Sequence, residues 1–318
     1  MQKFLMAVDG SNRCNDVIAS LAKILKDVPD CNVLLYHCVQ SLSGSHYYRA
    51  LSELPQQYEI SAEAEKRMGG EILEQSRNIL LENGFSQAKI ELQLKLNSGD
   101  PAMDIVAEAK KKDIGAIVLG RRGLSRVATI LVGSVSRKVA EYSGSTPVWV
   151  VDATLHQSQK VLIAVQGMPG GRMLNRHAAE NIAHLPYSEY TFIHLMPPMP
   201  PYLWDDGHIL NPEERSTRQS QIDQWQAGYK KQFQEVMEEG KDALVQRGIN
   251  PDKVKMRVEP TKVGIARDLL AEIAREQYQM VIIGKKSLQK KTPFLLGSFA
   301  NKLLHNARGV ILCLVGSE

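Results

Sequence analysis

The chain has 318 residues, of which 43% are hydrophobic and 23% charged, and this balance excludes a disordered or collagen-like protein. Its 39 basic and 35 acidic side chains leave a formal charge of +4, which is too small to indicate a nucleic-acid-binding protein. No apolar run approaches the roughly 20 residues that span a bilayer, and no signal-peptide core follows the N-terminus. We therefore expect two domains in a cytoplasmic protein with no membrane partner.

The four cysteines are also consistent with the cytoplasm. Cys14, Cys31, Cys38 and Cys313 form no CxxC pair, and three of them lie among apolar residues. Such cysteines are typical of small buried hydrophobes in a reducing environment. We expect neither a metal site nor a disulfide framework.

A repeat organises the chain. Residues 3–10 (KFLMAVDG) recur as residues 160–167 (KVLIAVQG) at an offset of 157, whereas residues 116–120 (AIVLG) recur as 280–284 (MVIIG) at an offset of 164. A seven-residue insertion in the polar helix after Pro212 reconciles the two offsets. We expect one domain over 1–152, a connector over 153–159 and a second domain over 160–318.

In chain order, the first half predicts strands over 3–8, 31–39, 89–95, 116–119 and 147–151, most of them continuous apolar runs. Helices are predicted between the strands. Asp100 is expected to cap a helix that has Pro101 in its first turn and buries Met103, Val106 and Ala109. The alternation predicts two tandem α/β domains, each with a doubly wound, open, five-stranded parallel sheet.

Two stretches, 40–55 and 196–212, leave the second strand of each half and carry aromatic residues. Two interpretations remain open: these residues anchor each loop against its own domain, or they form a lid or partner surface. The aromatic residues in question are Tyr47, Tyr48, Tyr202 and Trp204.

The fourth strand of the first half leads into a glycine-rich loop. Gly120 and Gly123 are followed, after nine residues, by Gly133 and Ser134, which open a helix. Glycine allows positive φ and a close approach of the backbone to a ligand, and the free N–H groups of a helix N-terminus attract an anion. Asp9 follows the first strand and is expected at the same sheet edge, where its carboxylate would meet donor groups of a base or ribose.

These residues resemble those of the universal stress protein family in its tandem two-domain form. The resemblance rests on Val8-Asp9-Gly10-Ser11 and on the Gly-x2-Gly-x9-Gly-Ser spacing, and it covers nearly the whole chain. The resemblance implies a fold like that of the adenine nucleotide alpha hydrolases. It also implies that the first domain binds ATP, with or without Mg²⁺. The cofactor-binding residues that it implies are Ala7, Asp9, Cys38, Leu119, Gly120, Arg121, Gly123, Gly133, Ser134, Val135 and Ser136.

The second half departs from this pattern. Gln166 replaces the acidic residue and Ser287 replaces the second glycine, whereas Gly297-Ser298 persists. We expect this site to be empty or to bind another anion. Four lysines in the loop, interpreted as a solvated surface, still supply positive charge: Lys285, Lys286, Lys290 and Lys291.

No catalytic constellation stands out, since the sequence has no HExxH, GxSxG or Walker A motif. His37 and His194 recur at equivalent strand ends, which favours a structural role. Arg121, Arg122 and Arg126 are typical of charge around an anionic ligand.

We therefore expect a nucleotide-binding stress-response protein with an unidentified protein partner. The alternatives are a slow ATPase or autophosphorylating hydrolase, with Ser134 or Ser136 as acceptor, and a nucleotide-independent scaffold. The resemblance also implies that the two halves pack about a pseudo-two-fold axis, with further self-association left open. The short apolar strands over 147–151 and 310–315 are candidate edges that invite pairing.

Overall fold

The computed structural model describes residues 2–40, 62–121, 132–197, 211–285 and 296–316. The first half contains five strands, β1 (Gln2–Ala7), β2 (Cys31–Cys38), β3 (Ile90–Lys95), β4 (Ala116–Gly120) and β5 (Val148–Val151). Its helices are α1 (Asn12–Leu25), α3 (Ala62–Glu82), α4 (Pro101–Lys111) and α5 (Ser134–Tyr142). The aromatic residues of the two long stretches, 47, 48, 202 and 204, lie outside the described residues.

The second half repeats this order. Its strands are β6 (Lys160–Ala164), β7 (Glu189–Met196), β8 (Val254–Pro260), β9 (Met280–Gly284) and β10 (Ile311–Val315). Its helices are α6 (Met168–His177), followed by a π-helical turn over Ala178–Ile182, then α7 (Pro212–Val245), α8 (Ile265–Glu276) and α9 (Ser298–Asn306). The strands predicted for the first half agree with the observed bounds of β1 to β5 to within about two residues.

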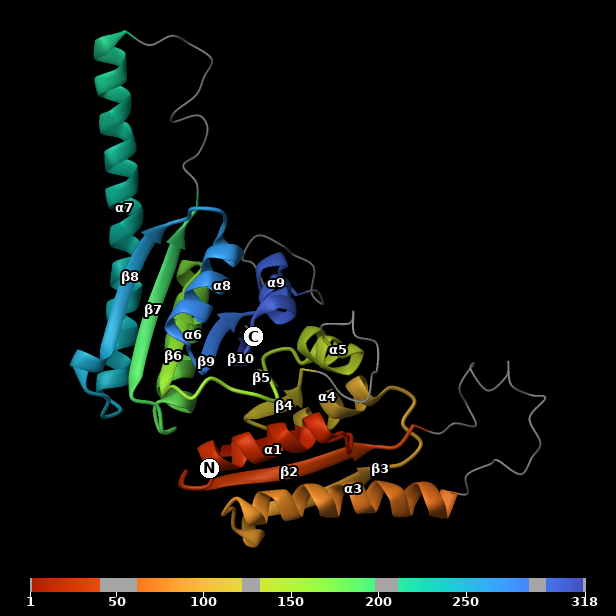
Figure 1. Ribbon diagram of the computed structural model, residues 1–318. Coiled ribbons are helices and arrows are strands. Elements are labelled where there is room, and N and C mark those ends of the chain that lie inside the picture. The colour runs from red at the N-terminus through yellow and green to blue at the C-terminus, as the bar shows by residue number, and fades with distance from the viewer. Residues whose placement is uncertain (1, 41–61, 122–131, 198–210, 286–295, 317–318) are drawn as a thin grey trace, which may run out of the picture.

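The ten strands form one sheet in the order β3-β2-β1-β4-β5-β10-β9-β6-β7-β8. Within each half all pairs are parallel, whereas β5 and β10 pair antiparallel. This antiparallel pair, the seam, joins the two halves through the strands predicted as candidate edges. Figure 1 shows the two halves side by side, with β5 and β10 between them.

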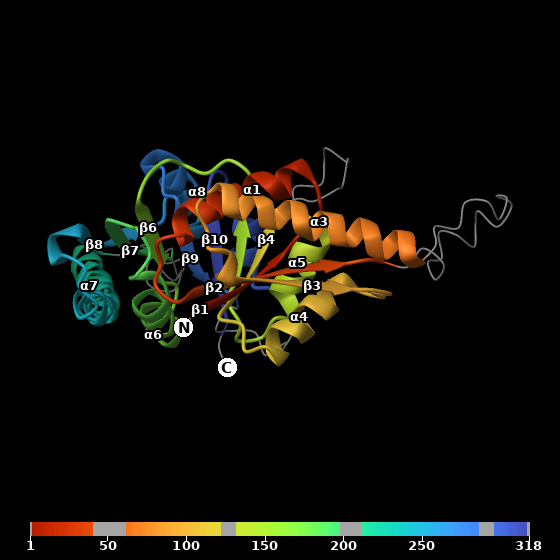
Figure 2. The same ribbon diagram turned by 90° about the horizontal axis from the view of Figure 1, so that it is seen from below.

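Helices cover both faces of the sheet, as the doubly wound prediction requires. Buried side chains of α1, α3, α6 and α7 form one core with one face, and those of α4, α5, α8 and α9 form the other. Figure 2 gives the second view of these layers. Because both faces are covered, central strands such as β5 and β10 are buried throughout.

The shift in the repeat falls between β7 and β8. Val33 pairs with Ile90 and Tyr190 pairs with Val254, so the offset changes from 157 to 164 between these strands. The connecting helix α7 has 34 residues, and α3 has 21. An Asn211–Glu214 capping box and Pro212 start α7, so its long polar sequence begins as a well-defined helix.

The predicted cap of α4 is confirmed, but its predicted buried face is wrong in one position. The Asp100 carboxylate accepts hydrogen bonds from the backbone N–H groups of Ala102 and Met103. Met103 is 41% exposed, and the buried residues of the helix are Ala102, Ile105, Glu108 and Ala109. The buried face of the helix therefore begins one residue earlier, at Ala102 and Ile105 instead of Met103 and Val106.

Candidate functional site

The strand order places a ligand crevice in each half. Order 3-2-1-4-5 reverses direction between β1 and β4, and the second half reverses in the same way between β6 and β9. In open α/β sheets, ligands bind beyond the carboxyl ends of the strands at such a switch point. In the first half, Ala7 ends β1 and Gly120 ends β4, so both line up at this edge.

Asp9 lies in the turn between β1 and α1. Its Oδ1 accepts hydrogen bonds from the Ser11 backbone N–H at 3.0 Å and from the Ser11 hydroxyl at 2.7 Å. Ser11 in turn caps α1 through Cys14 N–H. Gly10 has φ of 74°, and a Cβ there would come within 2.9 Å of Ile72 Cγ1, so glycine is required. The turn therefore holds the carboxylate at a fixed position.

The opposite wall is the N-terminus of α5. Gly133 is its N-cap and has no side chain to cap it, and the first turn of the helix carries no acidic residue. Ser134 is exposed at the first helical position, and Val135 is partly buried against the core. The first N–H groups of this helix are thus available to an anion. The Ser136 hydroxyl instead donates to the Gly120 carbonyl at 2.8 Å, which ties the helix to the end of β4.

The remaining expected residues that the structure describes flank this edge, with one exception. Leu119 is buried in β4, and Cys38 ends β2 with its thiol beside the Pro101 carbonyl. Burial raises the pKa of the Cys38 thiol to about 11, so the thiol is neutral at physiological pH. Gly123, and with it Arg122 and Arg126, lies outside the described residues.

Arg121 is the exception, because its side chain turns away from the edge. It is 4% exposed, forms an ion pair with Asp152, and donates to the Leu304 carbonyl of α9 in the other half. Its contacts therefore hold the seam together. Its backbone still belongs to the edge, since the Gly133 N–H donates to the Arg121 carbonyl at 2.8 Å.

Lys285 occupies the equivalent position in the second half and behaves in the same way. Its ammonium donates to Ser143 Oγ at 2.6 Å, to the Gly144 carbonyl at 3.0 Å and to the Thr146 carbonyl. It is 4% exposed, so its interpretation as a solvated loop residue is wrong. The other three lysines of that loop, Lys286, Lys290 and Lys291, and Ser287 lie outside the described residues.

The two histidines make matching contacts. His37 Nδ1 donates to the Val8 carbonyl at 2.7 Å, and His194 Nδ1 donates to the Val165 carbonyl at 2.6 Å. Each bond fastens the second strand of its half to the residue that follows the first strand. This repetition supports the predicted structural role.

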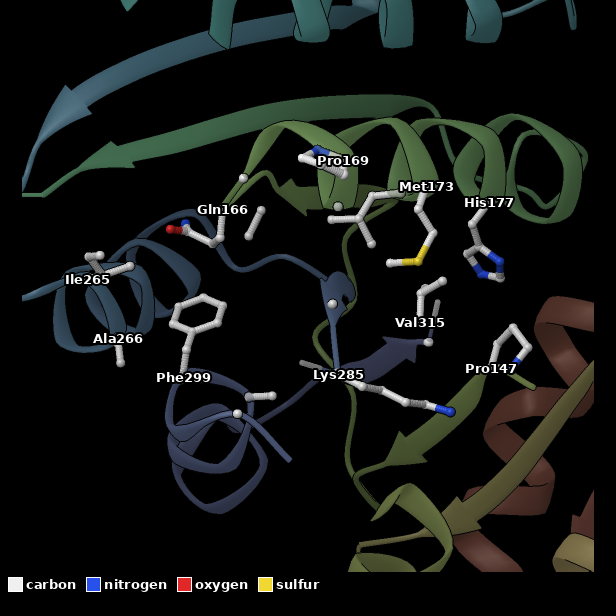
Figure 3. A pocket seen from close by; sticks show the side chains of 18 of the residues that line it. Pro147, Gln166, Pro169, Met173, His177, Ile265, Ala266, Lys285, Phe299 and Val315 are labelled. Carbon is white, nitrogen blue, oxygen red and sulfur yellow. The ribbon is translucent and has the colours of Figure 1, made fainter. Parts of the chain in front are cut away.

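The edge of the second half opens into a large cavity of about 1390 Å³. Figure 3 shows Gln166, Ile265 and Phe299 at one end and Met173, His177 and Pro147 at the other. The first end is the counterpart of the Asp9 edge. The second end, between α6 and the seam, was not predicted, because its walls come from segments far apart in the sequence. The residues that the structure describes hold no cluster of three or more potential metal ligands.

The tandem repeat, the doubly wound sheet and the crevice at each switch point define a class of protein: two fused domains of Rossmann-like fold. The sequence model described as "Universal stress protein family" matches residues 1–152 and 157–313. The chain therefore belongs to the universal stress protein family. None of the described helices is long and apolar enough to cross a membrane.

Individual relatives agree. The chain is 28% identical over 151 residues to "Universal stress protein YxiE" of Bacillus subtilis (strain 168), covering 47% of this chain and 97% of that one. It is 23% identical over 245 residues to a universal stress protein of Mycolicibacterium smegmatis, and the match covers 74% of this chain and 72% of that one. A crystal structure of a universal stress protein from Archaeoglobus fulgidus DSM 4304 matches with a TM-score of 0.60 at 17% identity, over 99% of this chain and 98% of that chain. This last likeness concerns the fold.

Proposed function

We propose that the protein is a stress-response regulator that binds one ATP at the edge of its first half, with the bound nucleotide favouring a conformation that a protein partner recognises. The observation that carries the proposal is that the fixed Asp9 carboxylate and the N-terminus of α5, whose N-cap Gly133 has no side chain, follow the two strands that flank a switch point. A carboxylate accepts hydrogen bonds from ribose hydroxyls or a base, whereas a helix N-terminus favours phosphates. One molecule that carries both chemistries is a nucleotide.

The two walls lie in the order that a nucleotide needs. Asp9 follows β1, and Gly120 and Gly133 lead from β4 into α5. Gly123, from the sequence, belongs to the loop that joins them. The base and ribose would thus face β1 and β2, with Ala7 and Cys38 nearby, and the phosphates would face β4 and α5. This arrangement supports binding, and besides Asp9, which Ser11 already holds, the described residues named here supply no base for hydrolysis.

Calorimetric titration of the intact chain with ATP tests the proposal. We expect about one ATP per chain and about tenfold or more weaker binding in Asp9→Asn, which keeps an acceptor for Ser11 but removes the charge. The matched control is Gln166→Asn, which shortens the amide at the equivalent position of the second half and should leave ATP affinity unchanged. Absence of ATP binding, or loss of binding in the control alone, contradicts the assignment.

The same samples separate binding from turnover. The binding proposal predicts that ATP stays intact after prolonged incubation with Mg²⁺. Formation of ADP that depends on Mg²⁺ and is lost in Ser134→Ala would instead favour the slow ATPase.

A further inference from the structure

The cavity of the second half is larger than a mononucleotide site requires. Small-molecule sites usually occupy about 300–1000 Å³, whereas this cavity has about 1390 Å³. It has two parts. The edge lobe, lined by Gln166, Ile265, Ser298 and Phe299, lies at the switch point. The seam lobe, lined by Pro147, Met173, Leu174 and Val315, continues between α6 and the seam.

A comparison of equivalent positions in the two halves explains why the seam lobe is large in the second half. The equivalent place in the first half holds a pocket of about 210 Å³, lined by Arg13, Arg121, Val151 and Asp152 among others. In the second half, Gly170 stands at the position of Arg13, and Gly316 at that of Asp152. A Cβ at Gly170 would meet nothing within 4 Å. The loss of two long or charged side chains thus opens space that the first half fills.

The same comparison shows a change in charge. Four carboxylates of the first half have uncharged counterparts around the cavity: Asp9 becomes Gln166, Asp16 becomes Met173, Asp100 becomes Gly264, and Asp152 becomes Gly316. Among the described lining residues, Glu180 is the sole carboxylate, against Arg176, Arg267, Lys285 and Lys302. The walls therefore favour an anion over a cation.

The edge lobe has a defined place for that anion. The N-cap of α9 is Gly297, which has no side chain to cap the helix, and the first turn has no acidic residue. The neighbouring helix α8 differs, because its first turn carries the Asp268 carboxylate, which accepts from the N–H groups of the preceding Lys262, Val263 and Gly264 and places negative charge at that N-terminus. An anion in the cavity is thus directed to α9.

The seam lobe has more apolar walls, with Glu180 and Asn181 lining the cavity beyond His177. Leu174 and Val315 are 2% and 4% exposed, and Met173 packs partly buried beside them. His177 lies at this end (Figure 3), and burial lowers its pKa to about 4, so it is neutral at physiological pH. The Lys285 ammonium is already engaged by the first half. A charged group would lose its hydration in this lobe, whereas an apolar chain would gain contacts.

We propose that the second half binds a chain-bearing anion, with a phosphate or carboxylate at the N-terminus of α9 and an alkyl or acyl chain in the seam lobe. The site is separate from the ATP site of the first half. The two halves would then read two different classes of small molecule within one sheet.

Titration of the intact chain with dodecyl phosphate, below its micelle-forming concentration, tests this proposal. We expect one molecule per chain, and much weaker binding of inorganic phosphate, which lacks the chain. Met173→Asp should weaken binding of dodecyl phosphate about tenfold or more, because it buries a carboxylate beside the chain. Ser298→Glu should do the same by placing negative charge at the anion's position.

Matched variants exclude indirect effects. Gly170→Arg, which restores the first-half residue, should block the seam lobe, whereas Gly228→Arg on the exposed part of α7 should bind as the parent protein does. Ser134→Glu should weaken ATP but leave dodecyl phosphate unchanged. No binding of dodecyl phosphate to the parent protein, or equal binding to the Gly170→Arg and Gly228→Arg variants, overturns the proposal. Either result leaves the ATP site untouched.

Discussion

At the scale of single residues, two buried histidines show how packing sets charge. Burial lowers the pKa of His177 to about 4 and also that of His194 to about 4. His194 stacks on Phe233 with ring centroids 3.5 Å apart, and His177 Nε2 lies 3.4 Å from the Cys313 thiol. Both rings are therefore neutral in the folded protein at neutral pH.

These histidines predict acid sensitivity. Since their pKa is lower in the folded than in the unfolded chain, the unfolded chain binds more protons between about pH 6.5 and 4. The free energy of unfolding should be full above about pH 6.5 and fall as pH drops toward 4, by up to about 1.4 kcal/mol per unit for each histidine. Urea unfolding at several pH values measures this slope. His177→Gln should reduce it, and an unchanged slope would contradict the role of this ring.

At the scale of elements, each half supplies a cation that reaches across the seam to a helix end of the other half. Arg121 donates to the Leu304 carbonyl in α9, and Lys285 donates to acceptors just after α5. Helix C-terminal carbonyls have no partner within their own helix, and a cation also suits the negative end of the helix dipole. The residue after β4 thus caps a helix of the other half, and its counterpart after β9 holds the turn that follows α5.

Lys285→Ala removes the second of these contacts. It should lower the free energy of unfolding by about 2–3 kcal/mol, because the buried Ser143 hydroxyl and the partly buried bonds to the Gly144 and Thr146 carbonyls lose a charged donor. Thermal unfolding by circular dichroism measures the loss. Lys302→Ala is the control, since it removes an exposed lysine of the same half from α9. Equal effects of the two substitutions would argue against this role of Lys285.

At the scale of the whole molecule, the pseudo-two-fold axis that relates the halves passes between two residues of different types. Trp149 and Cys313 are equivalent in the repeat, and they pair with each other across the seam. Both are fully buried, and Trp149 also packs on Phe4 with centroids 5.0 Å apart. A large side chain on one side of the axis is thus matched by a small one on the other.

Cys313→Trp would place two indoles at this axis. We expect a loss of about 1–3 kcal/mol in the free energy of unfolding, as is typical of overpacked cores. Cys313→Ala is the control and should cost less, because it removes a single sulfur atom. Stability of the tryptophan variant equal to that of the parent protein would show that the seam has room that its full burial does not suggest.

Most of the fold could be predicted from the sequence, because strands covered on both faces are apolar along their whole length. The repeat also located the inserted segment, and Asp100-Pro101 marked the start of α4. Met103 was placed wrongly because spacing gives the helical period but not its phase. Of the first-half site, the structure describes Asp9, Gly120 and the start of α5, and their shared edge follows from the strand order.

The side-chain contacts between the halves were beyond prediction from the sequence, although the strands that pair at the seam were predicted as candidate edges. The partners of Lys285 lie some 140 positions earlier in the chain, and no local pattern connects them. The cavity depends in the same way on Pro147 and Val315 meeting at the seam. The one available signal was the paired loss of Arg13 and Asp152 at Gly170 and Gly316, which becomes visible when the two halves are compared position by position.

The antiparallel seam has a consequence for how the protein changes over generations. In a homodimer, every substitution at the axis occurs twice and meets its own copy. Here β5 and β10 belong to one chain, so a substitution on one side meets an unchanged partner, and the pairing does not depend on protein concentration. The seam therefore frees each half to specialise while the other preserves the shared sheet.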